Sequence, residues 1–109
     1  MTFDDLANCD SFTFDVTQED IRAGRPRHCM ECPIALAIAR TLDLKGAPVY
    51  VSGAWLRPIQ IQNPDFSPKA ITRLCFARTT EVMEFVRDFD NLLPVKPTTF
   101  TLKRVNDDL

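Results

Sequence analysis

Residues 28–39 have the sequence HCMECPIALAIA, a Cys-x-x-Cys pair that runs directly into an apolar stretch. Proline suits the first position of a helix, because its missing N–H would have no partner there and its φ is already helical. The stretch therefore predicts a helix from Pro33 to about Leu42, with Cys32 as its N-cap. Because apolar residues cover nearly all of its sides, we expect the sheet on one side and a second layer or a second subunit on the other.

The segments on either side of this helix predict a mixed fold. Residues 11–16 alternate apolar and polar side chains as a half-buried strand does, and residues 17–24 suggest a short capped helix. Residues 80–90 carry apolar side chains at helical spacing and predict the second main helix. Further strands are expected at residues 49–52, 59–62, 71–76 and 98–102. This order predicts an α+β fold, with a mainly antiparallel sheet of about four to five strands and two main helices on one face.

The composition is that of one globular domain. The 109 residues are 45% hydrophobic and 26% charged, enough to bury a core. We expect residues 1–109 to form a single domain, with residues 1–10 as a loose arm and residues 103–109 as a polar tail. A net charge of -2 makes nucleic acid an unlikely partner, since nucleic-acid binders usually carry a basic excess. No apolar run approaches the roughly 20 residues that cross a membrane, and the N-terminus lacks the basic start of a signal peptide, so we expect a cytoplasmic protein.

The two thiols of the Cys-x-x-Cys pair leave three interpretations open. Cys29 and Cys32 have the spacing of one zinc knuckle, but zinc needs about four ligands and the second knuckle is missing. Completing the set would take Cys9, His28 or Cys75. A thiol at a helix start is also stabilised as a thiolate, which suggests redox chemistry, although Glu31 opposes it. We favour reduced thiols packed at the helix start, with no cofactor and no metal ligand assigned.

Catalytic residues are not evident in this sequence. The single histidine, His28, is the sequence neighbour of Cys29, and adjacent side chains usually point apart. No glycine-rich loop of the kind that holds phosphates is present. We therefore predict that the protein is not an enzyme.

Two surfaces are candidates for binding a partner. A basic loop precedes the N-terminus of the 33–42 helix, where anions are favoured, and could hold a phosphate or an acidic protein surface. The alternative is that its arginines only make the loop soluble. The second surface is the aromatic and proline-rich segment 53–69, because aromatic and arginine side chains on loops commonly anchor protein interfaces. The candidate binding residues are Arg25, Arg27, His28, Trp55, Arg57 and Phe66.

Three stretches of the chain resemble a group of small proteins of tailed phages, prophages and actinobacteria. They are residues 16–24 (VTQEDI with Gly24), residues 29–37 (CMECPIALA) and residues 82–97 (VMEFVRDFD and VKP). The resemblance transfers no activity, but it implies a phage or prophage context in which small non-enzymatic proteins often bind and inhibit a host factor. It thus favours a protein that acts by stoichiometric contact with a host protein. A zinc- or redox-active module, a nucleic-acid-associated accessory protein and a homodimer remain as alternative or additional hypotheses.

Overall fold

The computed structural model describes residues 3–42, 49–51, 57–63 and 73–105 of the chain. Within these ranges it contains short and long helices around a single sheet. The elements are α1 (Phe3–Ala7), β1 (Ser11–Val16), α2 (Gln18–Ala23), α3 (Pro33–Thr41), β2 (Val49–Tyr50), β3 (Ile59–Gln62), β4 (Arg73–Phe76), α4 (Thr80–Asp90) and β5 (Thr98–Val105).

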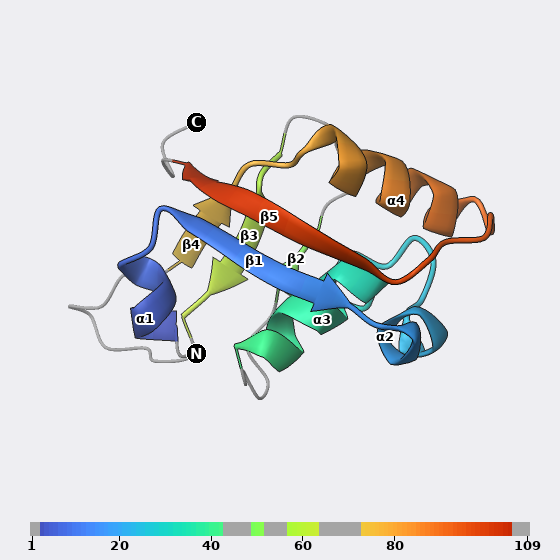
Figure 1. Ribbon diagram of the computed structural model, residues 1–109, viewed down its shortest axis with the longest axis horizontal. Helices are drawn as coiled ribbons and strands as arrows, with labels where there is room; N and C mark the ends of the chain where they lie inside the picture. Colours follow the sequence, from blue (N-terminus) through green and yellow to red (C-terminus); the bar gives the residue numbers. More distant parts are fainter. Residues whose placement is uncertain (1–2, 43–48, 52–56, 64–72, 106–109) are drawn as a thin grey trace.

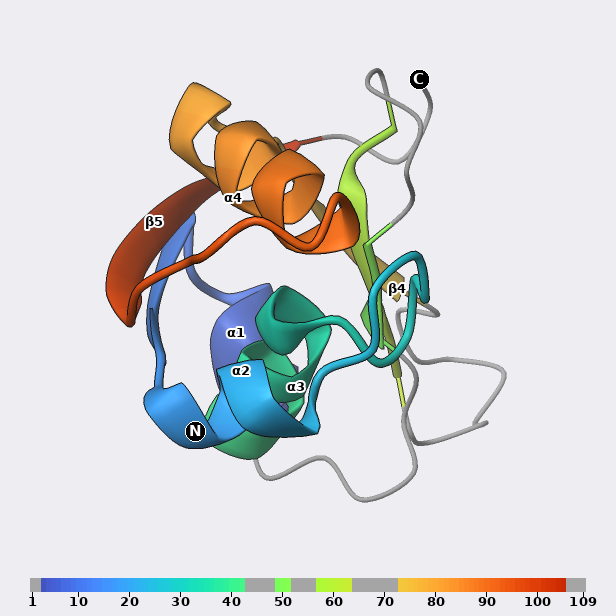
Figure 2. The same cartoon turned by 90° about the vertical axis from the view of Figure 1, so that its right-hand side faces the viewer.

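The strands form one antiparallel sheet in the order β1-β5-β4-β3-β2 (Figure 1). The first and last strands of the chain therefore lie side by side, with Phe14 opposite Phe100. β2 and β3 pair with each other, with Val49 opposite Ile61. The sheet curls, and both main helices, α3 and α4, lie inside the curl (Figure 2). The predicted α+β class with a mainly antiparallel sheet is confirmed.

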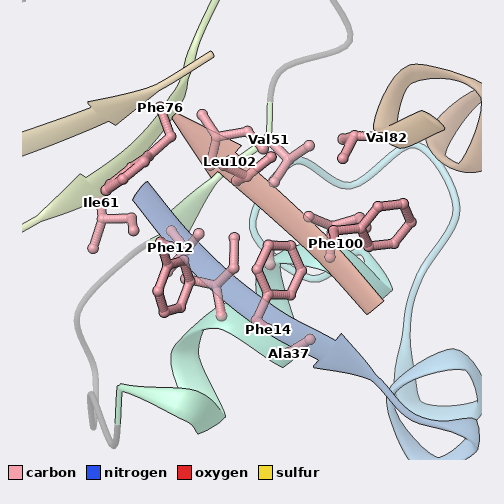
Figure 3. Close-up of a cluster of buried hydrophobic side chains, with 14 of the residues drawn as sticks. Phe12, Phe14, Ala37, Val51, Ile61, Phe76, Val82, Phe100 and Leu102 are labelled. Atoms are coloured by element: carbon pink, nitrogen blue, oxygen red, sulfur yellow. The ribbon is translucent and has the colours of Figure 1, made fainter. Parts of the chain in front are cut away.

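The inner face of the sheet is aromatic, and the outer face is polar. Alternate residues of β1 are buried, so Phe12 and Phe14 point inward together with Phe100 of β5 (Figure 3). The Phe100 ring meets the ring of Phe85 from α4 edge-on, at 5.6 Å between centroids. Each such buried side chain contributes about 1.5–3 kcal/mol of hydrophobic free energy. The strand periodicity of residues 11–16 thus places Phe12 and Phe14 in the core, where their rings meet those of Phe76 and Phe100.

Helix α3 fills the space between the two edge strands of the sheet. It packs against β1, β2 and α2, and its residues Ile34 and Ile38 are fully buried. The second apolar layer that the sequence predicted for this helix is therefore supplied within the chain. Cys32 is its N-cap and Pro33 its first residue, as predicted.

The C-terminal end of α3 is fixed by a network of charged groups. Arg40 donates from Nη2 to the carboxylate Oδ2 of Asp20 at 3.0 Å and to the backbone oxygen of Asp15 in β1 at 2.8 Å. Thr17, the N-cap of α2, forms a capping box with Asp20. Burial acts to raise the pKa of Asp20, but hydrogen bonds from Arg40 and Thr17 outweigh it and hold the pKa below its usual value. This network joins α2, α3 and the edge of the sheet.

The N-terminal arm and the C-terminal tail differ from the prediction. Residues 3–7 form the helix α1, whose Phe3 and Leu6 are buried in the core, so the expectation of a loose arm over residues 1–10 is wrong. Five residues are too few for a helical period to be detected, and burial of two side chains holds this turn in place. Residues 103–105 of the expected tail belong to β5, which extends beyond the predicted strand. The Arg104 side chain also donates a hydrogen bond to the backbone oxygen of Ala7.

Candidate functional site

The basic loop, residues 25–32, is held to the body of the protein by backbone hydrogen bonds. The N–H of Val51 donates to the oxygen of Cys29 at 2.8 Å, which extends the β2 edge into the loop. The N–H of Arg27 donates to Oδ1 of Asp90, in the last turn of α4, at 2.8 Å. The loop is therefore anchored on both the sheet and α4, although most of its side chains are exposed.

Gly24 lets α2 and α3 approach closely just before this loop. A β-carbon at Gly24 would lie 2.7 Å from both Cγ and Cδ of Pro33, closer than real β-carbons come to other atoms. The glycine was expected only to end α2, which it does. Because Gly24 has no side chain, the ring of Pro33 can also lie against it, which brings the two ends of the basic loop close together.

One carboxylate of the basic loop, that of Glu31, faces both Arg25 and His28. Nε of Arg25 and Nε2 of His28 lie 3.4 and 3.5 Å from Oε2 of Glu31. Exposed pairs of this kind contribute about 0–1 kcal/mol to stability, but they neutralise the surface on which they lie. The guanidinium of Arg27 differs, because it forms no hydrogen bond or ion pair with any part of the chain that the structure describes. Arg27 is thus the arginine of the loop whose side chain has no ion pair among the described residues.

Arg27 also has an unusual backbone. Its φ is 61°, in the left-handed region that costs a residue with a side chain about 1–2 kcal/mol. The hydrogen bond to Asp90 and the bonds at either end of the loop hold it in this conformation. Strained residues of this type are found preferentially at ligand and partner sites.

Two adjacent pockets lie where the loop meets α4. One, of about 250 Å³, lies between the loop and the helix, and the other, of about 340 Å³, lies along α4. Val86 and Asp90 line both pockets, which are together called the depression beside the loop. The first is lined by Arg27, His28, Cys29, Cys32, Val51, Val86 and Asp90. The second is lined by Arg78, Thr80, Met83, Glu84, Val86, Arg87, Asp90 and Asn91.

The two thiols of the Cys-x-x-Cys pair have different environments. Cys29 is exposed, whereas Cys32 is buried and its Sγ accepts the N–H of Ala35 at 3.5 Å. Burial raises the pKa of Cys32 to about 11, so this thiol is protonated at neutral pH. Residues 3–42, 49–51, 57–63 and 73–105 contain no group of three His, Cys, Asp or Glu side chains placed to hold a metal ion. The geometry therefore gives Cys32 the role of a buried helix cap.

The second predicted surface is only partly within the described residues. Trp55 and Phe66 lie outside them. Arg57 is exposed just before β3 and lines neither of the two pockets. The structure thus brings together Arg25, Arg27 and His28 and does not add Arg57 to them.

The C-terminal turn of α4, residues 91–94, was not predicted as part of a site. Leu92 has a φ of 63° and ends the helix, with its N–H bonded to the oxygen of Phe89 and the N–H of Leu93 bonded to the oxygen of Asp88. A helix end closed by this pair of hydrogen bonds usually has glycine at the left-handed position. The sequence signal was available, because residues 91–94 are NLLP and a helix end with two leucines and no glycine is unusual.

Comparisons with known proteins leave the interpretation of this site to its geometry. No protein-family model, curated protein or solved structure matches the chain. None of the helices among the described residues has the length and hydrophobicity needed to cross a membrane.

Proposed function

We propose that the protein binds another protein stoichiometrically through the basic loop, residues 25–32. The observation that carries this proposal is the combination of a fixed backbone with exposed side chains. The loop is hydrogen-bonded to Asp90 of α4 and to Val51, yet the Arg27 side chain is exposed and has no partner among the residues that the structure describes. A loop that is ordered before binding loses little conformational entropy when a partner docks, which favours affinity.

The depression beside the loop supports a binding role over catalysis. Its thiol Cys32 is buried and protonated at neutral pH, so it is a poor nucleophile. His28 lies near Glu31, but its imidazole is exposed to solvent. An open, mixed polar and apolar depression of this kind can accommodate side chains of a partner without a chemical step.

The resemblance to small phage and prophage proteins supports a host protein as the partner. In that context the chain would act in the host cytoplasm by occupying a surface of a host or defence factor. Such inhibition requires one molecule of the protein for each molecule of its target. It involves no turnover.

The test is capture of a host protein by the full-length tagged chain, followed by reconstitution from purified components. Light scattering of the purified complex should give a fixed ratio of the two chains. Arg27→Glu should weaken the complex by about tenfold or more, since it reverses the unpaired charge at the centre of the loop. Arg22→Glu is the matched control, because Arg22 is an exposed arginine of α2 that pairs with Glu19 away from the pockets.

The proposal is overturned if no complex of fixed ratio can be reconstituted. It is also overturned, as far as this loop is concerned, if Arg27→Glu and Arg22→Glu bind the partner equally well.

A further inference from the structure

The connection between α4 and β5 carries two exposed prolines three residues apart. Residues 93–97 have the sequence LPVKP and belong to neither a helix nor a strand. They lie at one end of the long axis of the molecule, between α4 and β5 (Figure 1). Pro94 and Pro97 are both exposed, and so are Leu93 and Lys96. The segment thus presents most of its side chains to solvent, although regular structure fixes both of its ends.

The sequence of this segment favours the polyproline II conformation. The ring of a proline holds φ at about −65°, and a residue before proline is kept out of the α region. These two rules apply to Leu93, Pro94, Lys96 and Pro97, and Val95 between them has no positive φ. A polyproline II helix has no internal hydrogen bonds. In agreement, residues 94–97 make no backbone–backbone hydrogen bond with any described part of the chain.

Burial in this segment follows the three-residue turn of a polyproline II helix. Positions i and i+3 share one edge, so Pro94 and Pro97 lie on one edge, Leu93 and Lys96 on the second and Val95 on the third. Val95 is half-buried and packs against the core, whereas the four other residues are exposed. The edge of Val95 therefore holds the segment against the body of the protein, and the other two edges face outward.

We infer that residues 93–97, here called the proline segment, are a polyproline II ligand whose partner is a protein with a groove lined by aromatic side chains. Such grooves recognise two prolines at positions i and i+3, which lie about 9 Å apart along the helix. This inference goes beyond the proposed function, because it requires no contact from the basic loop.

The proline segment fits such a groove in two further respects. It is fixed at both ends and by Val95, so little conformational entropy is lost when a partner binds. The backbone oxygen of Lys96 accepts the hydroxyl of Thr98 at 2.8 Å, but the other backbone oxygens of the segment accept no hydrogen bond from the described residues. They are available to the indole N–H and phenol O–H donors of an aromatic groove.

The test uses two purified domains whose grooves are of this kind, an SH3 domain and a WW domain. Each is titrated into the full-length ¹⁵N-labelled chain. At least one of them should shift the amide signals of the non-proline residues between 92 and 98, with a dissociation constant of about 1 mM or below. The control is the same domain with its groove tryptophan replaced by alanine, which should cause no shifts.

Variants of the proline segment show whether its exposed edges are what the groove binds. Pro94→Ala with Pro97→Ala should weaken binding at least about fivefold, because both rings are lost from one edge. Pro58→Ala is the matched control, since it removes a half-buried proline just before β3 and should bind as the unmodified chain does. If the double variant does not fold, Leu93→Ala provides the same test. Its side chain is 53% exposed, and its loss should weaken binding at least about threefold.

The inference is overturned if neither domain shifts the signals of residues 92–98, or if the shifts are confined to other parts of the chain. It is also overturned if the double proline variant and Leu93→Ala both bind like the unmodified chain. None of these results bears on the host-protein complex, which the proposed function assigns to the basic loop and which holds or fails on its own.

Discussion

The two ends of helix α3 are built in different ways. At its C-terminal end Arg40 binds the carboxylate of Asp20 and the backbone of Asp15, so Arg40 and Asp20 both have partners. At its N-terminal end Cys32 is buried, but the loop before it exposes the Arg27 side chain, which has no partner in the described part of the chain. The comparison suggests that one end of the helix stabilises the fold and that the other end is available for contact with another molecule.

Removing the charge of Asp20 should have the largest effect, because it breaks the stabilised end. Asp20→Asn loses the ion pair to Arg40 and part of the capping box, so we expect the free energy of unfolding to fall by about 2 kcal/mol at pH 7. Urea denaturation measures this change. Binding of the host protein should not change, since Asp20 lines neither of the two pockets beside the basic loop.

The effect of Asp20 should also depend on pH in a defined direction. Its pKa is lower in the folded protein than the usual value of 3.8, so its contribution is complete above that value and is lost as the pH falls through the folded pKa. The difference between the unmodified chain and Asp20→Asn should therefore shrink below about pH 4. A difference that stays constant down to pH 2 would contradict the role assigned to this carboxylate.

Gly24→Ala tests the close approach of α2 and α3 before the basic loop. The added β-carbon meets the rigid ring of Pro33 at 2.7 Å, and overpacking of this kind costs about 1–3 kcal/mol. In a Pro33→Ala background the ring is absent, so most of that cost should disappear. A double-mutant cycle by urea denaturation measures the coupling, and additive effects would show that the contact does not matter.

Arg27→Gly should raise the free energy of unfolding by about 0.5–1 kcal/mol, because glycine adopts the left-handed backbone of this position without strain. Arg22→Gly is the matched control. Arg22 lies within α2, where glycine costs about 1 kcal/mol. The same substitution should thus have opposite signs at the two arginines in chemical denaturation. Destabilisation at both positions would mean that the loop backbone is not strained.

The two thiols should differ in reactivity with little effect on the fold. Cys29 is exposed, whereas Cys32 is buried with a pKa raised to about 11. Alkylation of the folded protein at neutral pH, followed by peptide mapping, should label Cys29 first and leave Cys32 nearly unmodified. Comparable labelling of both thiols would contradict the burial of Cys32 and would favour the redox hypothesis for the N-terminal end of α3.

Much of the fold was predictable because its signals are local. Proline after Cys32 marks the start of α3, and the alternation of residues 11–16 marks a half-buried strand, so both were predicted with nearly their observed bounds. The helix α1 was missed because five residues contain too little periodicity. Its stability comes from contacts with the core, which are distant in sequence.

The site was predictable only in part, because it is made by tertiary contacts. The sequence pointed to Arg25, Arg27 and His28 as a group, but it did not show that Glu31 faces Arg25 and His28 while Arg27 is held at its backbone by Asp90. Nor did it connect Arg27 with Leu92, since the hydrogen bond through Asp90 joins segments 63 residues apart. Trp55 and Phe66 stay predictions.

The most direct test of the contact surface is to measure stability and affinity together on Arg27→Gly. Because glycine relieves the left-handed strain, the free energy of unfolding should rise by about 0.5–1 kcal/mol. Affinity for the host protein should fall by about tenfold or more, because the exposed guanidinium is lost from the basic loop. Opposite changes would mean that the residue serves binding at the expense of the fold. Unchanged affinity, or a loss of stability and affinity together, would contradict the account.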